Sequence, residues 1–140
     1  MGRINGRNKG ANAEREAAVW LKQQFKLEHL PQRNLEQYRY GAHVKSTGFD
    51  LQGFPPFCFE VKRVEKLNLR SWWVQAVNAT TEEYHRPVVM FRQNRGKFHF
   101  LISAKLIGLG NGFIQLEDRE FVKWVNYTLQ ALDPDPDPDN

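Results

Sequence analysis

The hydrophobic pattern near the N-terminus has the period of a helix. Between about residues 11 and 28, apolar side chains recur every three or four positions, at Ala17, Ala18, Leu21 and Phe25. This spacing predicts an amphipathic helix with one buried face. Glu14 falls on that face, whereas Glu16 points away from it toward solvent.

The rest of the chain consists of short apolar runs separated by turns. Residues 49–53 and 57–64 predict a hairpin joined at Pro55-Pro56, and the segment 31–40 could be a further strand. Further strands are expected at residues 87–92, 97–103 and 113–116, and further helices at about residues 68–85 and 118–132.

This order of elements predicts a central mixed β-sheet flanked by helices, in the α/β class. A chain of 140 residues suits one domain with its own core. We expect a flexible basic arm at residues 1–10 and a single domain at 11–132. The acidic tail 133–140, which has no apolar residue to bury, is expected to be disordered.

The charge of the chain is unevenly distributed. The net charge is +4, but four aspartates lie in the tail, and without them it rises to +8. Such an excess favours an anionic partner, most often nucleic acid. With one cysteine, no apolar run long enough to span a bilayer and no apolar secretory segment at the N-terminus, we expect a cytoplasmic protein without a membrane partner.

Three charged residues interrupt the apolar hairpin. Alternate side chains on a strand share a face, so Glu60 and Lys62 lie side by side, and Asp50 on the preceding strand can converge with Glu60. Two carboxylates on rigid strands suit Mg²⁺ or Mn²⁺, which prefer oxygen ligands. The competing interpretation is an edge strand whose charges prevent aggregation.

Glu14 and Gln75 bear on that choice. A carboxylate on a buried helix face is costly without a partner, and a metal shared with Asp50 and Glu60, or an ion pair with a lysine, would supply one. Gln75 lies in the apolar segment WWVQAVNA. It is either a structural amide bonded to a neighbouring loop or part of an active site.

Taken together, the segments KGANAERE, STGFDLQG, FEVKR and PVVMFR resemble the PD-(D/E)xK nuclease superfamily, with its restriction-endonuclease-like fold. The nearest likeness is to Holliday-junction resolvases of the archaeal type, which some phages also carry. Their opening Lys-Gly-x-x-x-Glu-Arg-Glu helix matches Lys9 to Glu16, and the likeness covers about residues 8–103. Phe49 replaces the proline of the motif's name, and the span from Glu14 to Asp50 is longer than in compact archaeal members.

The resemblance implies that Asp50 and Glu60 bind Mg²⁺, with Mn²⁺ as a substitute, aided by the carbonyl of Val61. Glu14 would complete the metal site directly or through water. Lys62 would orient or activate the attacking water. We favour a positioning role, because a base would need a pKa far below the reference of about 10.4. The implied catalytic residues are Glu14, Asp50, Glu60, Lys62 and Gln75.

Basic residues around these segments are the candidates for contacts with DNA. Arg15 follows Glu14 directly, and cations alternate with aromatic residues between Tyr38 and Lys45. The expected DNA-binding residues are Arg3, Arg7, Lys9, Arg15, Arg33, Arg39, Lys45 and Arg63.

We therefore expect a metal-dependent, structure-selective DNA endonuclease, specifically a Holliday-junction resolvase acting on branched or duplex DNA. Symmetric cuts need two active sites, so the resemblance implies a homodimer in a bacterial, archaeal or phage-infected cell. One alternative is a recombination exonuclease or nicking endonuclease of the same fold. The others are a DNA-binding module without catalysis and a basic adaptor for acidic proteins.

Overall fold

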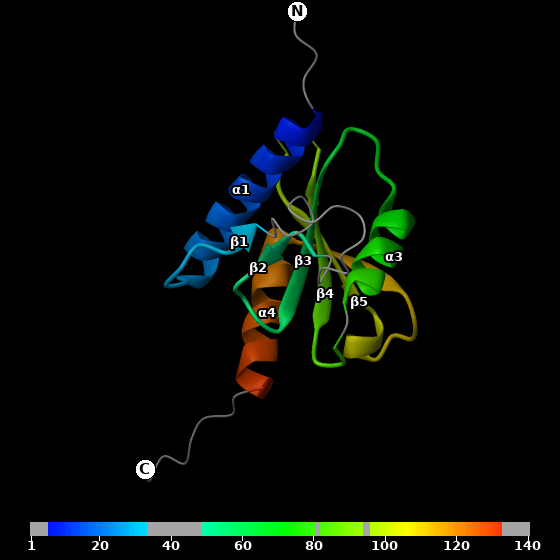
Figure 1. Cartoon of the computed structure of the whole chain (residues 1–140). Helices are drawn as coiled ribbons and strands as arrows, with labels where there is room; N and C mark the ends of the chain where they lie inside the picture. Colours follow the sequence, from blue (N-terminus) through cyan, green and yellow to red (C-terminus); the bar gives the residue numbers. More distant parts are fainter. Residues whose placement is uncertain (1–5, 34–48, 81, 94–95, 133–140) are drawn as a thin grey trace, which may run out of the picture.

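The computed structural model describes residues 6–33, 49–80, 82–93 and 96–132, with the backbone alone at residues 6–9. Within these residues, six strands form one mixed sheet, and helices cover both of its faces (Figure 1). The α/β architecture predicted from the order of the elements is confirmed.

The strands lie side by side in the order in which they occur in the chain. Only β3 and β4 pair in parallel, and the helix between them makes the crossover connection; the other neighbours are antiparallel. The strands are β1 Gln32–Arg33, β2 Leu51–Gln52, β3 Phe57–Arg63, β4 Arg86–Arg92, β5 His99–Ser103 and β6 Phe113–Glu117.

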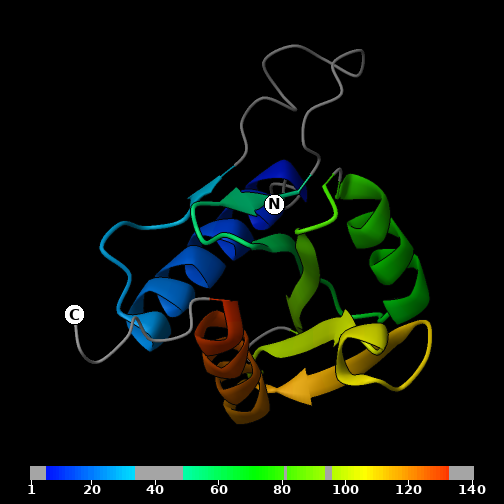
Figure 2. The ribbon, with the colours of Figure 1, turned by 90° about the horizontal axis from the view of Figure 1, so that it is seen from below.

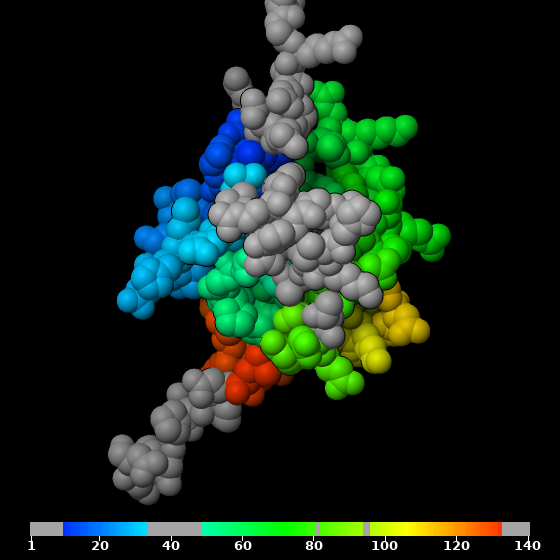
Figure 3. Space-filling view, viewed as in Figure 1, coloured from blue at the N-terminus to red at the C-terminus, as the bar shows by residue number. Residues whose placement is uncertain are grey.

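The helices divide between the two faces of the sheet (Figure 2). One face is covered by α1 (Gly6–Phe25) and α4 (Asp118–Leu132), and the other by α3 (Leu69–Ala79). The short 3-10 helix η2 (Lys105–Ile107) connects β5 to β6. In the space-filling view, α1 (blue) and α3 (green) lie on opposite sides of the molecule (Figure 3).

The side chains of β3 alternate as predicted. Phe57, Phe59 and Val61 pack in the core cluster that includes residues of α1 and α4. Cys58, Glu60 and Lys62 therefore face the other side of the sheet, where α3 lies. The strand is central and buried rather than an edge, which removes the interpretation of its charges as protection against aggregation.

Several boundaries differ from those expected. α1 begins at Gly6, so residues 6–10 belong to the helix and not to an arm. The two early glycines lower helix propensity, but they do not forbid a helix. α3 ends at Ala79 and not at residue 85, because the backbone becomes extended at Thr80. In the segment 31–40 the structure describes Pro31 and the two residues of β1. Residues 1–5, 34–48 and the tail 133–140 lie outside the described residues. No helix in the described part is long and apolar enough to cross a membrane.

Candidate active site

Asp50 is held against β3 by two hydrogen bonds. Its backbone N–H donates to the carbonyl of Phe59 at 2.8 Å, and its side-chain Oδ2 accepts from the N–H of Val61 at 2.8 Å. The residue stands directly before β2, where the strand pairing of the hairpin stops. Asp50 is thus tied to the backbone on either side of Glu60, by its own N–H at Phe59 and by its carboxylate at Val61.

Glu60 is a carboxylate buried in the middle of a sheet. It is 1% exposed, and its carboxylate oxygens have no hydrogen-bond partner among the described residues apart from the neighbouring Asp50 carboxyl, with which Glu60 can share a proton. Its register partner on β4, Val89, is fully buried. An ionised carboxylate in such a position is costly unless a proton or a cation accompanies it.

The surroundings shift the pKa values of both acids upward. Burial raises the pKa of Glu60 to about 8, and the neighbouring charge of Asp50 adds to that effect. Burial also raises the pKa of Asp50 to about 6, against the hydrogen bond from Val61, which lowers it. Two carboxyl groups so close together favour binding of a proton or a cation between them.

Glu14 faces inward, as predicted from the helix period. It is 8% exposed, and its Oε2 accepts a hydrogen bond of 2.5 Å from Nε of Arg33. Of the two partners expected for Glu14, a metal or an ion pair, the structure shows an ion pair. It is formed with an arginine of β1 and not with a lysine. Glu14 is near enough to the acidic pair for its charge to raise the pKa values of Asp50 and Glu60.

Lys62 and Gln75 meet between the sheet and α3. Lys62 Nζ donates to Gln75 Oε1 at 2.9 Å. The two residues are 13 positions apart, and the packing of α3 on the sheet brings them together. Gln75 is therefore bonded to the lysine and not to a loop, which favours the interpretation that it is part of the site.

Glu16 is partly exposed and forms ion pairs that were not expected from the sequence. Its carboxylate accepts hydrogen bonds from Nη2 of Arg92 and from Nη1 of Arg63, the latter 3.4 Å from both oxygens. Its side chain is 42% exposed, against 25% and 20% for the two arginines. Glu16 is therefore off the buried face, as expected, but its ion pairs were not predicted, because the carboxyl ends of β3 and β4 each bring an arginine to α1.

The expected DNA-binding residues fall into three groups. Arg15 is exposed and donates to Asn12 Oδ1 at 3.1 Å, so it remains accessible to a ligand. Arg33 and Arg63 are already paired with glutamates of α1. For Arg7 and Lys9 only the helical backbone is described, and Arg3, Arg39 and Lys45 lie outside the described residues.

Among the residues that the structure describes, no three side chains of His, Cys, Asp and Glu cluster closely enough to hold a metal on their own. Asp50 and Glu60 are thus a two-carboxylate site, with Glu14 set apart by its pairing with Arg33. A divalent cation fits the pair, because the Glu60 oxygens have no other partner in this part of the chain.

Arg92 is the residue of this region that the sequence analysis missed. Its register partner is Arg63, and both lie on the α1 face of their strands, as the alternation with Val61 and Met90 indicates. That alternation could have revealed them, because two inward-facing arginines on adjacent strands require an acidic partner on the helix that covers them.

The comparisons with known proteins agree with this geometry. No curated protein and no solved structure matches the chain. One family model, described as "Phage putative PDDEXK endonuclease", matches residues 5–133 and so spans all the described strands and helices. The chain belongs to this family of phage endonucleases.

Proposed function

We propose that this endonuclease is metal-dependent and structure-selective, and that it resolves four-way DNA junctions as a homodimer in the cytoplasm of the infected cell. The observation that carries the proposal is the buried Glu60 carboxylate, whose one polar neighbour among the described residues is another acid, Asp50. A buried acidic pair of this kind is stabilised by a cation.

Asp50 and Glu60 would hold Mg²⁺ or Mn²⁺, together with the carbonyl of Val61 and water molecules. The hydrogen bond from Val61 engages only Oδ2 of Asp50. The N–H and C=O of one strand residue point to the same edge, so the Val61 carbonyl is directed toward the side on which Asp50 lies. A cation bound there supplies a water of lowered pKa and stabilises the charge of the phosphate.

Lys62 would orient the attacking water and the phosphate. Its ammonium group donates to Gln75, which fixes the direction of a long, flexible side chain. A positioned cation beside the scissile phosphate stabilises charge that develops in the transition state. Gln75 would act through Lys62, as a positioning residue.

Glu14 would reach the cation through water while Arg33 holds its carboxylate in place. A third negative charge close to the pair strengthens the attraction for a cation, as the raised pKa values of Asp50 and Glu60 indicate. Exposed Arg15, one position further on the helix, would contact a DNA phosphate.

Cleavage of a synthetic four-way junction, a linear duplex and a single strand, each with Mg²⁺, tests the proposal. We expect paired cuts at symmetric positions of the junction, no cuts in EDTA, and a dimer by light scattering. Preference for duplex ends would replace the resolvase with an exonuclease, and scattered single cuts in duplex would indicate a nicking endonuclease.

The variant Asp50→Asn tests the metal site directly. It should abolish cleavage and leave junction binding largely intact, since the loss of one negative charge does not weaken contacts with phosphate. Asp118→Asn is the matched control, because Asp118 lies at the start of α4 and asparagine also caps helices. Cleavage by Asp50→Asn at the rate of the control would refute the metal assignment.

A further inference from the structure

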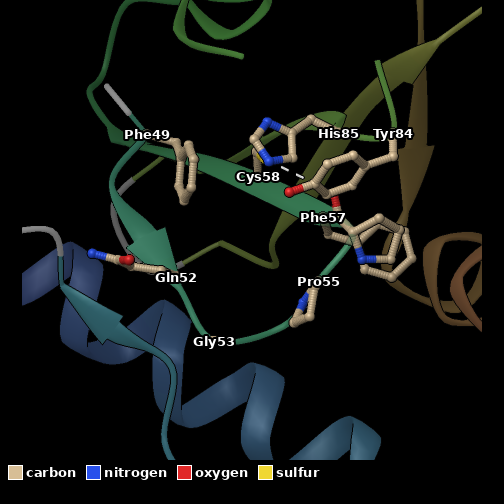
Figure 4. Close-up of a pocket in the computed structure, with 9 residues that line it drawn as sticks. Phe49, Gln52, Gly53, Pro55, Phe57, Cys58, Tyr84 and His85 are labelled. Carbon is tan, nitrogen blue, oxygen red and sulfur yellow. Dashed lines mark hydrogen bonds between the residues drawn. The ribbon is translucent and has the colours of Figure 1, made fainter. Parts of the chain in front are cut away.

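A pocket beside the acidic pair has no role in the proposed mechanism. It occupies about 220 Å³ at the turn of the β2–β3 hairpin, on the side of Cys58 (Figure 4). The described residues that line it are Phe49, Gln52, Gly53, Pro55, Pro56, Phe57, Cys58, Tyr84 and His85.

The walls of the pocket are mainly rings. Tyr84 and His85 meet edge to face with their centroids 4.6 Å apart, and His85 meets Phe49 in the same way at 5.9 Å. Figure 4 shows these three rings and Pro55 around one opening. Surfaces of this kind bind flat aromatic groups by stacking.

The pocket also contains polar atoms that could recognise the edge of a ring. Gln52 contributes an exposed amide, and His85 contributes its imidazole ring, whose Nδ1 lies beneath the surface without a hydrogen-bond partner among the described residues. Cys58 is not a reactive group here, because burial raises the pKa of its thiol to about 12. The pocket is thus a place for binding rather than for nucleophilic chemistry.

Its position links the pocket to the scissile phosphate. Phe49 precedes Asp50 in the chain, and Cys58 lies two residues before Glu60 on the same face of β3, a distance of about 7 Å along a strand. A group in the pocket would therefore be a near neighbour of a phosphate at the acidic pair. Pockets for drug-sized ligands are larger, about 300–1,000 Å³.

We propose that this pocket binds one unpaired nucleobase of the DNA, adjacent to the phosphate at the acidic pair. A base reaches such a pocket only after leaving the duplex stack, which costs a few kcal/mol in paired DNA and least where pairing is already broken. The pocket would thus favour branched or mispaired DNA. This inference deepens the proposed function and rests on DNA binding at the same site.

Binding of single strands tests the pocket without cleavage. A short deoxyoligonucleotide with normal bases and its counterpart with abasic sites carry the same phosphates, and their affinities for Asp50→Asn are compared by fluorescence anisotropy. Stacking of one base predicts roughly five- to hundred-fold tighter binding of the strand with bases. Equal affinities of the two strands would overturn the inference.

Variants of Tyr84 assign the preference to the pocket. Tyr84 is 64% exposed, so Tyr84→Ala should fold, and it should remove most of the preference for bases, whereas Tyr84→Phe should keep it. Tyr127→Ala is the matched control, because Tyr127 is 73% exposed and lies on α4, outside this pocket. If Tyr84→Ala weakens both strands by the same factor, the base does not bind here.

Cleavage of junctions by the unsubstituted protein is measured in a separate assay, which distinguishes failure of the pocket from failure of the proposed function. A protein that cuts junctions without a preference for bases would keep the proposed function and lose the pocket. A preference for bases without cleavage by the unsubstituted protein would keep the pocket and lose the nuclease proposal.

Discussion

Arg33 Nε donates to Glu14 Oε2 at 2.5 Å and thereby joins β1 to α1 beside the Asp50–Glu60 pair. The two residues are 19 positions apart, and both side chains are largely buried, with 21% and 11% exposure. The arginine holds a carboxylate near the site where two further acids already need a cation. The Arg33–Glu14 ion pair therefore stabilises the fold and keeps a negative charge near the acidic pair.

Arg33→Ala should lower the free energy of unfolding by about 1–3 kcal/mol, because it leaves the buried Glu14 carboxylate without its partner. Urea unfolding followed by circular dichroism measures the change. Arg15→Ala is the control, since Arg15 is exposed and bonds only Asn12 among the described residues; its effect should stay within about 0.5 kcal/mol. Equal effects of the two substitutions would contradict a structural role of the pair.

Gln75→Ala should reduce the cleavage rate roughly 10-fold, because Lys62 loses the acceptor that directs its ammonium group. Lys62→Ala should cost more, on the order of 10²–10³, since it removes the cation itself. Asn78→Ala, an exposed amide on the same helix, is the control. Single-turnover cleavage separates the cases, and a rate for Gln75→Ala equal to that of Asn78→Ala would remove Gln75 from the site.

The local pattern of apolar and polar residues was sufficient to predict most of the helices and strands. The run PVVMFR and the period of residues 118–132 predicted β4 and α4 close to their observed bounds, because each element buries a continuous apolar set. β1 is described at Gln32 and Arg33 only, and its pairing with β2 is a contact that no local pattern encodes. The early start of α1 was missed because glycines weigh against a helix without excluding one.

In the candidate site, the face on which each side chain lies could be predicted from local pattern, but the partners of the charged side chains could not. Alternation on one strand placed Glu60 and Lys62 on one face, and the helix period turned Glu14 inward. The partners of charged side chains were harder to predict. Glu16 pairs with Arg63 and Arg92, which lie 47 and 76 positions away, so only the packing of α1 on the sheet reveals the cluster.

Glu16→Gln should strengthen DNA binding, because Arg63 and Arg92 would lose the carboxylate that now neutralises them and become available to phosphate. Each additional DNA phosphate that these arginines neutralise should steepen the dependence of log K on log salt by about 0.9. Titrations at several salt concentrations measure this slope. Glu117→Gln, at an exposed position at the end of β6, is the control for the loss of a charge. An equal increase in affinity in both variants would exclude a specific role for the arginine pair.

Metal-free protein should lose stability as the pH rises, because Glu60 titrates differently in the folded and unfolded chain. Burial raises its pKa to about 8 from the ordinary 4.5. Below about pH 4.5 the carboxyl is protonated in both states and costs nothing. Between pH 4.5 and 8 the unfolded chain releases the proton more readily, so the free energy of unfolding falls until the folded state also ionises.

Comparison with Glu60→Gln gives the contribution of Glu60 together with its effect on the pKa of Asp50. The glutamine keeps the shape without the charge, so the difference in unfolding free energy between the unsubstituted protein and the variant should decline from pH 4.5 to 8 in EDTA. Mg²⁺ at pH 8 should then stabilise the unsubstituted protein and leave the variant unchanged, because a bound cation compensates the buried charge. Parallel pH curves for the two proteins, with no effect of Mg²⁺ on either, would show that Glu60 neither titrates near pH 8 nor binds the metal.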